Sequence, residues 1–137
     1  MLLVLAAVLA VPAAGLAIPT SMTLVPAQYV GSTSQGIPVT MDTSAKGVTD
    51  FSFYWRARCS DHKVHVNGID AGGGSATPVN AKGRFAISGV LNTGGFFKIK
   101  GTIKADRAFG TLSRRGKTAF GVNCRIPTVH WRAYPIG

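Results

Sequence analysis

Histidine and aspartate are the residues of this sequence that could support acid–base, nucleophilic or metal chemistry. His62 and His65 stand three positions apart, a spacing that places the two side chains on opposite faces of a strand. Asp61 and His62 could form part of a nucleophilic triad, but no G-x-S-x-G motif supplies the serine. The chain has no Glu, and most of its Asp residues fall at expected turns, so a catalytic carboxylate pair is not expected either. We therefore expect no enzymatic activity, no catalytic residue, no metal ligand and no cofactor.

Basic side chains are far more prominent than acidic ones. Lys and Arg total 15 against five acidic residues, a formal net charge of +10, which favours polyanions by long-range attraction. Several of these cations share the expected outward faces of strands with aromatic residues, and they would form one stripe if the strands were neighbours. The candidate ligand-binding residues are Tyr54, Arg56, Arg58, Lys98, Lys100 and Arg132.

Two kinds of polyanion could bind such a stripe by charge and stacking: a sugar-phosphate polymer of the cell envelope, or single-stranded nucleic acid. The N-terminus and the two cysteines indicate export, which favours the envelope polymer, and no specific nucleic acid is expected. The alternative explanation is that the cations only solvate the outer faces and discourage pairing between sheet edges.

The N-terminus indicates export. Residues 1–17 have the apolar core and the small residues of a cleavable signal peptide, although the usual basic start is missing. No later apolar run is long enough for a transmembrane span. We expect a signal peptide at 1–17, a lead-in segment at 18–27 and one domain at 28–137. The protein would then be extracellular or attached to the cell wall.

The two cysteines, Cys59 and Cys124, agree with export. They lie far apart in the sequence and form no C-x-x-C pair, so a metal site is less natural than one disulfide in an oxidising compartment. Two buried free thiols are the alternative.

Residues 50–59 give the clearest structural signal. Phe51, Phe53 and Trp55 alternate with polar or basic residues, which is the pattern of a half-buried antiparallel strand. Residues 128–133 have a similar pattern around Trp131, and we expect these two strands to lie near one another.

Further strands are expected over most of the remaining chain. A motif G-x-F-x-I-x-G recurs at 83–91 and 95–103, which indicates one strand and one turn, repeated. Pro38 favours an edge position for its strand, and the glycine-rich segment 71–76 is expected to be a flexible loop. The other expected strands are 28–34, 37–42, 64–66, 109–112 and 118–124.

Short connections between successive strands predict an all-β, antiparallel, mainly up-and-down meander of about eight to ten strands. The sequence leaves open whether this is a small barrel or a two-sheet sandwich. A closed barrel could bind a small apolar ligand among its interior aromatic side chains. A protein-interaction or inhibitor module, using the glycine segment or the turn at Arg114 and Arg115, is a further alternative. The oligomeric state is left open.

One resemblance can be stated on these residues. The segment Tyr29-x-Gly31-x-Thr33-Ser34-Gln35-Gly36-x-Pro38-Val39, the two cysteines, Gly83-Arg84-Phe85 and Trp131-x-Ala133 resemble small secreted all-β domains of high-GC Gram-positive bacteria. The likeness covers nearly the whole chain after the signal peptide. It implies export and an all-β fold, and it assigns no functional residue.

Overall fold

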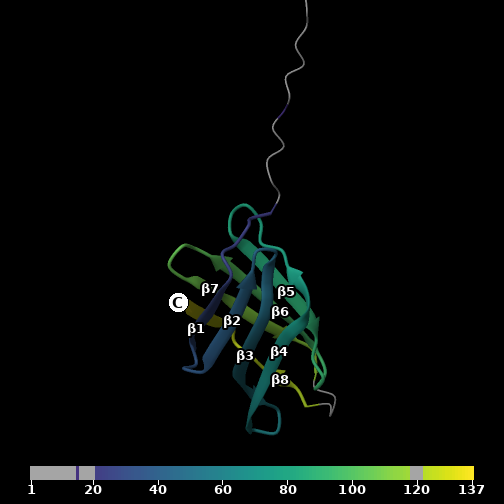
Figure 1. Ribbon diagram of the computed structural model, residues 1–137. Helices are drawn as coiled ribbons and strands as arrows, with labels where there is room; N and C mark the ends of the chain where they lie inside the picture. Colours follow the sequence, from purple (N-terminus) through teal and green to yellow (C-terminus); the bar gives the residue numbers. More distant parts are fainter. Residues whose placement is uncertain (1–14, 16–20, 118–121) are drawn as a thin grey trace, which may run out of the picture.

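The computed structural model describes residue 15 and residues 21–117 and 122–137. These residues form nine β-strands and no helix (Figure 1). The strands are β1 (Ala27–Thr33), β2 (Pro38–Ser44), β3 (Gly47–Cys59), β4 (Val64–Thr77), β5 (Arg84–Val90), β6 (Phe96–Ile103), β7 (Ala108–Arg115), β8 (Cys124–Arg125) and β9 (Val129–Ile136). The prediction of an all-β protein is confirmed.

One antiparallel sheet contains all of these strands, in the order β4-β3-β2-β1-β9-β7-β6-β5, with β8 paired to β3. It consists of two meanders, β1–β4 and β5–β7, and β9 joins them by pairing with both β1 and β7. The sheet curls into a half-barrel, whose two halves appear in Figure 1 as a nearer and a farther layer. Within the described chain its end strands β4 and β5 do not pair, so the curled sheet stays open along one side.

Strand β3 provides the centre of the core, as its alternation predicts. Phe51, Phe53 and Trp55 are fully buried, and the residues between them face outward. Burial of each aromatic ring removes a large apolar area from water, which is the main favourable term in folding. The ring of Phe51 meets the ring of Trp131 edge to face, with centroids 5.1 Å apart. Strands β3 and β9 therefore come near one another across the interior, although they are not neighbours in the sheet.

The repeated motif forms the β5–β6 hairpin, and its register explains the repeat. Phe85 lies opposite Gly101, and Gly89 lies opposite Phe97. Each large ring thus faces a glycine on the partner strand. A methyl group at Gly101 would overlap the rings of Phe85 and Trp131, so the missing side chain is what makes room for both.

Two local predictions are wrong. The segment 71–76 is not a loop but part of β4, with Gly72 opposite Asp50 next to an irregularity in the register of β3. Pro38 does not mark an edge strand, because β2 lies between β1 and β3. Pro38 instead occupies the first position of its strand, where proline is tolerated.

The segment before β1 packs onto the domain. The backbone N–H of Met22 donates to the carbonyl oxygen of Val79 at 2.7 Å, Ser21 forms a bridge with Asn80, and Leu24 is buried in the core. The expected signal peptide, apart from residue 15, lies outside the described residues, as does most of the expected strand 118–124. No described segment forms a helix long and apolar enough to span a membrane.

The two cysteines form the expected disulfide. Cys59 at the end of β3 lies opposite Cys124 of β8 and is bonded to it. The bond fixes the segment that connects β7 with β9 to the end of the long β3–β4 hairpin.

Candidate anion-binding groove

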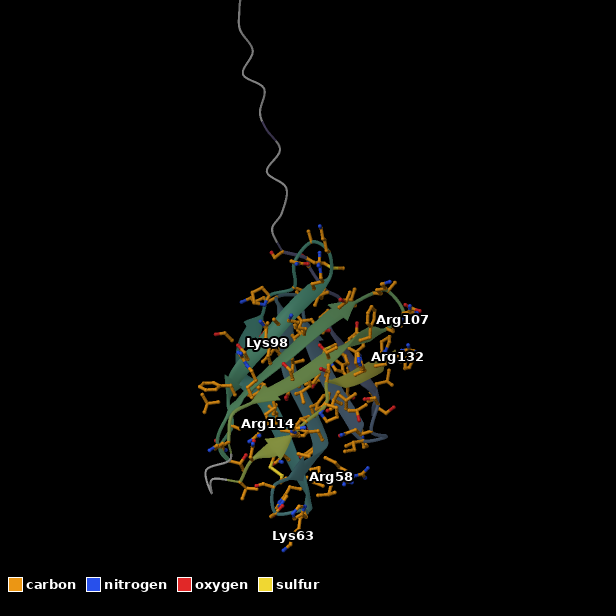
Figure 2. All side chains as sticks on the ribbon, turned by 180° about the vertical axis from the view of Figure 1, so that it is seen from behind. Arg58, Lys63, Lys98, Arg107, Arg114 and Arg132 are labelled. Carbon is orange, nitrogen blue, oxygen red and sulfur yellow. A yellow bond between two sulfur atoms is a disulfide. The ribbon has the colours of Figure 1, made fainter. Side chains whose placement is uncertain are left out.

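The structure places the candidate binding residues on two separate surfaces. Tyr54, Arg56 and Arg58 lie on β3, whereas Lys98 and Lys100 lie on β6 and Arg132 lies on β9. Four strands separate β3 from β6 in the sheet, so the single stripe does not form. Figure 2 shows Lys98 and Arg132 on the sheet that faces the viewer, and Arg58 at the lower end of the molecule near the disulfide.

Two of the β3 side chains have structural contacts of their own. The Arg56 guanidinium donates to the backbone carbonyl oxygen of Gln35 at 3.4 Å. The Arg56 backbone also exchanges two hydrogen bonds of 2.8 and 2.9 Å with the Gln35 side chain, which tie the β1–β2 turn to β3. The ring of Tyr54 covers Gly68 on β4, at a place where any side chain on residue 68 would overlap it. These contacts explain Arg56 and Tyr54 without a ligand.

Arg132 belongs to a row of outward side chains that crosses five strands, and Lys98 and Lys100 lie beside this row on β6. Arg84 of β5 lies opposite Thr102 of β6, which lies opposite Phe109 of β7. Phe109 lies opposite Arg132 of β9, and Arg132 lies opposite Ser32 of β1. Because opposite residues of antiparallel strands share a face, the row alternates cation, hydroxyl and aromatic ring. The backbones at Arg84 and Arg132 are about 14 Å apart, because three strand spacings separate them.

This row crosses two adjoining hollows. The larger hollow, of about 500 Å³, lies over β5, β6 and β7. The smaller one, of about 250 Å³, lies over β7, β9 and the end of β1. Phe109 and Gly110 line both, so the two form one depression that we call the basic groove. Its polar and aromatic lining residues include Ser32, Ser34, Arg84, Lys98, Lys100, Thr102, Phe109, Thr111, His130 and Arg132.

The groove is strongly cationic. In the described part of the chain, the salt bridges are His65–Asp61 and Arg107–Asp106, so no carboxylate neutralises the four Arg and Lys residues that line the groove. Two further cations lie over the ring of Phe109: Lys104 Nζ at 5.6 Å and the Arg107 guanidinium at 5.8 Å from its centroid. Unpaired cations on one concave face raise the local concentration of anions.

The described histidines do not assemble a catalytic group with aspartate in this groove. His130 is exposed there, and its backbone N–H donates to Ser34 Oγ at 3.1 Å. The ion-paired histidine is His65, whose Nε2 lies 2.7 Å from Asp61 Oδ2 at the tip of the β3–β4 hairpin. A hydrogen bond from the backbone N–H of Lys63, and then the one from His65, hold the pKa of Asp61 below its usual range.

The interior and the turns give less support to the other two functions. Trp55, Phe51 and Phe53 are fully buried and pack against one another, so core side chains occupy the space expected for an apolar ligand. Arg114 and Arg115 are not in a turn, as expected for a protein contact, but are the last two residues of β7. The Arg114 guanidinium donates to the carbonyl oxygens of Gly94 and Gly116, so it links the β5–β6 turn to the chain that follows β7.

Sequence reasoning found Lys98, Lys100 and Arg132 but missed the other groove residues, among them Arg84, Phe109 and His130. Arg84 was visible as the polar position of Gly83-Arg84-Phe85, and His130 as an outward position beside Trp131. Phe109 had a weaker signal, because its neighbours Ala108 and Gly110 are small and Leu112 is the only other large apolar residue of β7. Its outward direction agrees with the burial of Leu112 three positions on, and with its register with Thr102 and Arg132.

Comparisons of this chain with protein-family models, with curated proteins and with solved structures find no match.

Proposed function

We propose that this protein is an exported, non-enzymatic binding module that holds anionic polymers of the cell envelope in the basic groove. The observation that supports this function best is the row of outward side chains across β5, β6, β7, β9 and β1. It combines unpaired cations with an aromatic ring and hydroxyl groups in one depression.

The make-up of the groove favours a polymer in which anionic groups alternate with sugar rings. Lys98, Lys100 and Arg132 offer charge-assisted hydrogen bonds to phosphate or carboxylate groups. Ser32 and Thr102 can bond sugar hydroxyls, and Phe109 provides a flat apolar surface between the two hollows. A polymer lying across the strands would meet these groups in turn.

Export is part of the proposal. It is supported by the apolar N-terminal segment 1–17, by the Cys59–Cys124 disulfide and by the resemblance to secreted β-domains. In that compartment, wall and envelope polymers are the polyanions that a basic groove would meet.

The test compares two charge-reversal variants of equal net charge. The groove variant carries Lys98→Glu, Lys100→Glu and Arg132→Glu, and the control carries Lys46→Glu, Arg58→Glu and Lys63→Glu, all at exposed positions. Binding to purified bacterial envelope, and to heparin as a defined polyanion, is measured across a salt series. We expect the groove variant to bind roughly 100-fold more weakly, because each lost contact contributes on the order of 1 kcal/mol.

The salt dependence gives a second readout. Binding of the unmodified protein should fall steeply with salt, and the slope should be smaller for the groove variant because fewer counterions are released. Equal loss in the two variants would show that net charge alone attracts the polymer, and the groove would then have no specific role.

A further inference from the structure

Three side chains with metal-ligating atoms meet where the β3–β4 hairpin turns. Cys59 ends β3, Asp61 lies in the turn and His65 follows in β4. One ligand atom of each, the Cys59 sulfur, a carboxylate oxygen of Asp61 and a ring nitrogen of His65, lie within 4.8 Å of one another. Cys124 on β8 is the disulfide partner of Cys59, so a fourth ligand atom, the Cys124 sulfur, lies beside this cluster.

The positions of these residues are set by pairing and by turn hydrogen bonds. Cys59 lies opposite Cys124, and His65 is the second residue of β4, directly after the turn. The backbone N–H of Lys63 donates to Asp61 Oδ1 at 3.0 Å, which orients the carboxylate toward His65. The side chains of His65 and Asp61 are 44% and 33% exposed, so an ion can reach them from solvent.

The oxidation state of sulfur decides whether this cluster can hold a metal. Thiolate is the sulfur ligand that zinc takes, and the sulfurs of a disulfide are not thiolates. A dithiol reductant would cleave the Cys59–Cys124 bond, becoming a disulfide itself and leaving two thiols. Zn²⁺ would then displace the two thiol protons to solvent and find two sulfurs, one nitrogen and one oxygen.

Distance and charge both suit a tetrahedral zinc site. With zinc–sulfur bonds of about 2.3 Å and zinc–nitrogen bonds of about 2.0 Å, neighbouring ligand atoms stand roughly 3.3 to 3.8 Å apart. The three clustered atoms already lie within 4.8 Å of one another, and reduction would free the Cys124 sulfur to turn toward them. Two thiolates and a carboxylate around Zn²⁺ leave one negative charge, and the nearby chain carries the cations Arg58, Arg125 and Lys63. Figure 2 shows Arg58 and Lys63 at the same end of the molecule as the disulfide.

We propose that this end of the protein binds zinc when the Cys59–Cys124 disulfide is reduced and does not bind it when the disulfide is formed. The ligands are Cys59, Asp61, His65 and Cys124. The proposal is independent of the basic groove, which lies on other strands. It also departs from the sequence-based expectation of no metal ligand, because that expectation judged the histidines and the cysteines separately and did not place His65 beside Cys59.

The test uses the full chain, oxidised and reduced with a water-soluble phosphine. Zinc affinity is measured by competition with a chromophoric chelator, and Co²⁺ is added as a spectroscopic probe. We expect one equivalent of zinc to bind the reduced protein only, and Co²⁺ to show thiolate-to-metal charge transfer. His65→Asn should weaken zinc binding by about 100-fold. The matched variant His62→Asn should not, because His62 lies in the same turn with a left-handed backbone that asparagine tolerates.

Tryptophan fluorescence follows the fold in the same samples, because Trp55 and Trp131 are buried. A reduced chain that unfolds and is refolded by zinc supports the site, provided that His65→Asn abolishes the refolding. Three results would overturn the proposal: equal zinc binding by the oxidised protein, equal affinity of the His65→Asn and unmodified chains, or a reduced chain that neither binds zinc nor refolds with it.

Discussion

Phe109 is the side chain that separates attraction by charge alone from recognition of a sugar-containing polymer. It lies between the two hollows and beneath Lys104 and Arg107. Replacing it by Leu keeps most of the apolar volume and removes the ring. We expect Phe109→Leu to weaken binding of heparin about ten-fold, since stacking on an aromatic ring contributes about 1–3 kcal/mol.

Inorganic polyphosphate is the matched probe, because it has negative charge and no ring. Its affinity should change little in Phe109→Leu when both polymers are titrated at one salt concentration. Equal losses for heparin and polyphosphate would mean that Phe109 positions the surrounding cations and does not stack on the ligand.

At the same level of single residues, the sequence could not identify Phe109. A side chain's face in a strand is visible when large apolar residues alternate with polar ones, as around Trp55. In β7 the adjacent residues Ala108 and Gly110 are small, and Leu112 is the only other large apolar residue, so the alternation is too short to assign the face of Phe109. Arg84 and His130 stood at recognisable outward positions, but their membership of one groove depends on strand pairing.

The β5–β6 hairpin is held by the match between each ring and the glycine opposite it. Gly101→Ala would push a methyl group into the rings of Phe85 and Trp131. We expect a loss of about 1–3 kcal/mol in the free energy of unfolding, the usual cost of overpacking a core. Urea denaturation measures it, and Gly74→Ala is the control, because that position is open.

A second substitution identifies the cause. Phe85→Leu removes the part of the ring that the new methyl group meets, so the combined loss should be smaller than the sum of the two single losses. Strictly additive losses would show that Gly101 is required for its backbone and not for the space that it leaves.

Strands in which large apolar side chains alternate with polar ones could be predicted from the sequence. Strands without this alternation could not. The alternation in β3 and the repeat in β5 and β6 gave their positions closely. The second half of β4 was taken for a loop because Gly72, Gly73 and Gly74 carry no side chain whose face could be assigned. Its pairing comes from β3, whose long alternating run supplies a partner for the glycine segment.

The molecule as a whole depends on β9. This strand pairs with β1 on one side and with β7 on the other, and it contributes Val129, Trp131 and Ala133 to the core. A chain that ends at residue 125 should therefore lose cooperative unfolding, because its two meanders would no longer share a sheet. Denaturation followed by tryptophan fluorescence and far-ultraviolet circular dichroism tests this.

A synthetic peptide of residues 126–137 provides the complementary experiment. Added to the shortened chain, it should restore a cooperative transition and the affinity for heparin together, since β9 also carries Arg132. A shortened chain that unfolds cooperatively by itself would show that the two meanders can associate without β9.

The same dependence explains why the groove was not foreseen as one site. Ser32 and Arg132 lie near opposite ends of the sequence, and only the insertion of β9 between β1 and β7 makes them neighbours. Charge and alternation indicated cationic strand faces correctly. Long-range strand pairing decides which of these faces lie side by side, and local sequence patterns contain no information about it.

The place of β9 in the chain also sets the order in which the protein can assemble. During synthesis the hairpins of β1–β4 and then of β5–β7 become available, but the strand that unites them is made last. Until then β1 and β7 each have one free edge, and only the contacts inside each meander can form. The hairpins can thus form as the chain presents them, whereas the single curled sheet is completed only when β9 enters between β1 and β7.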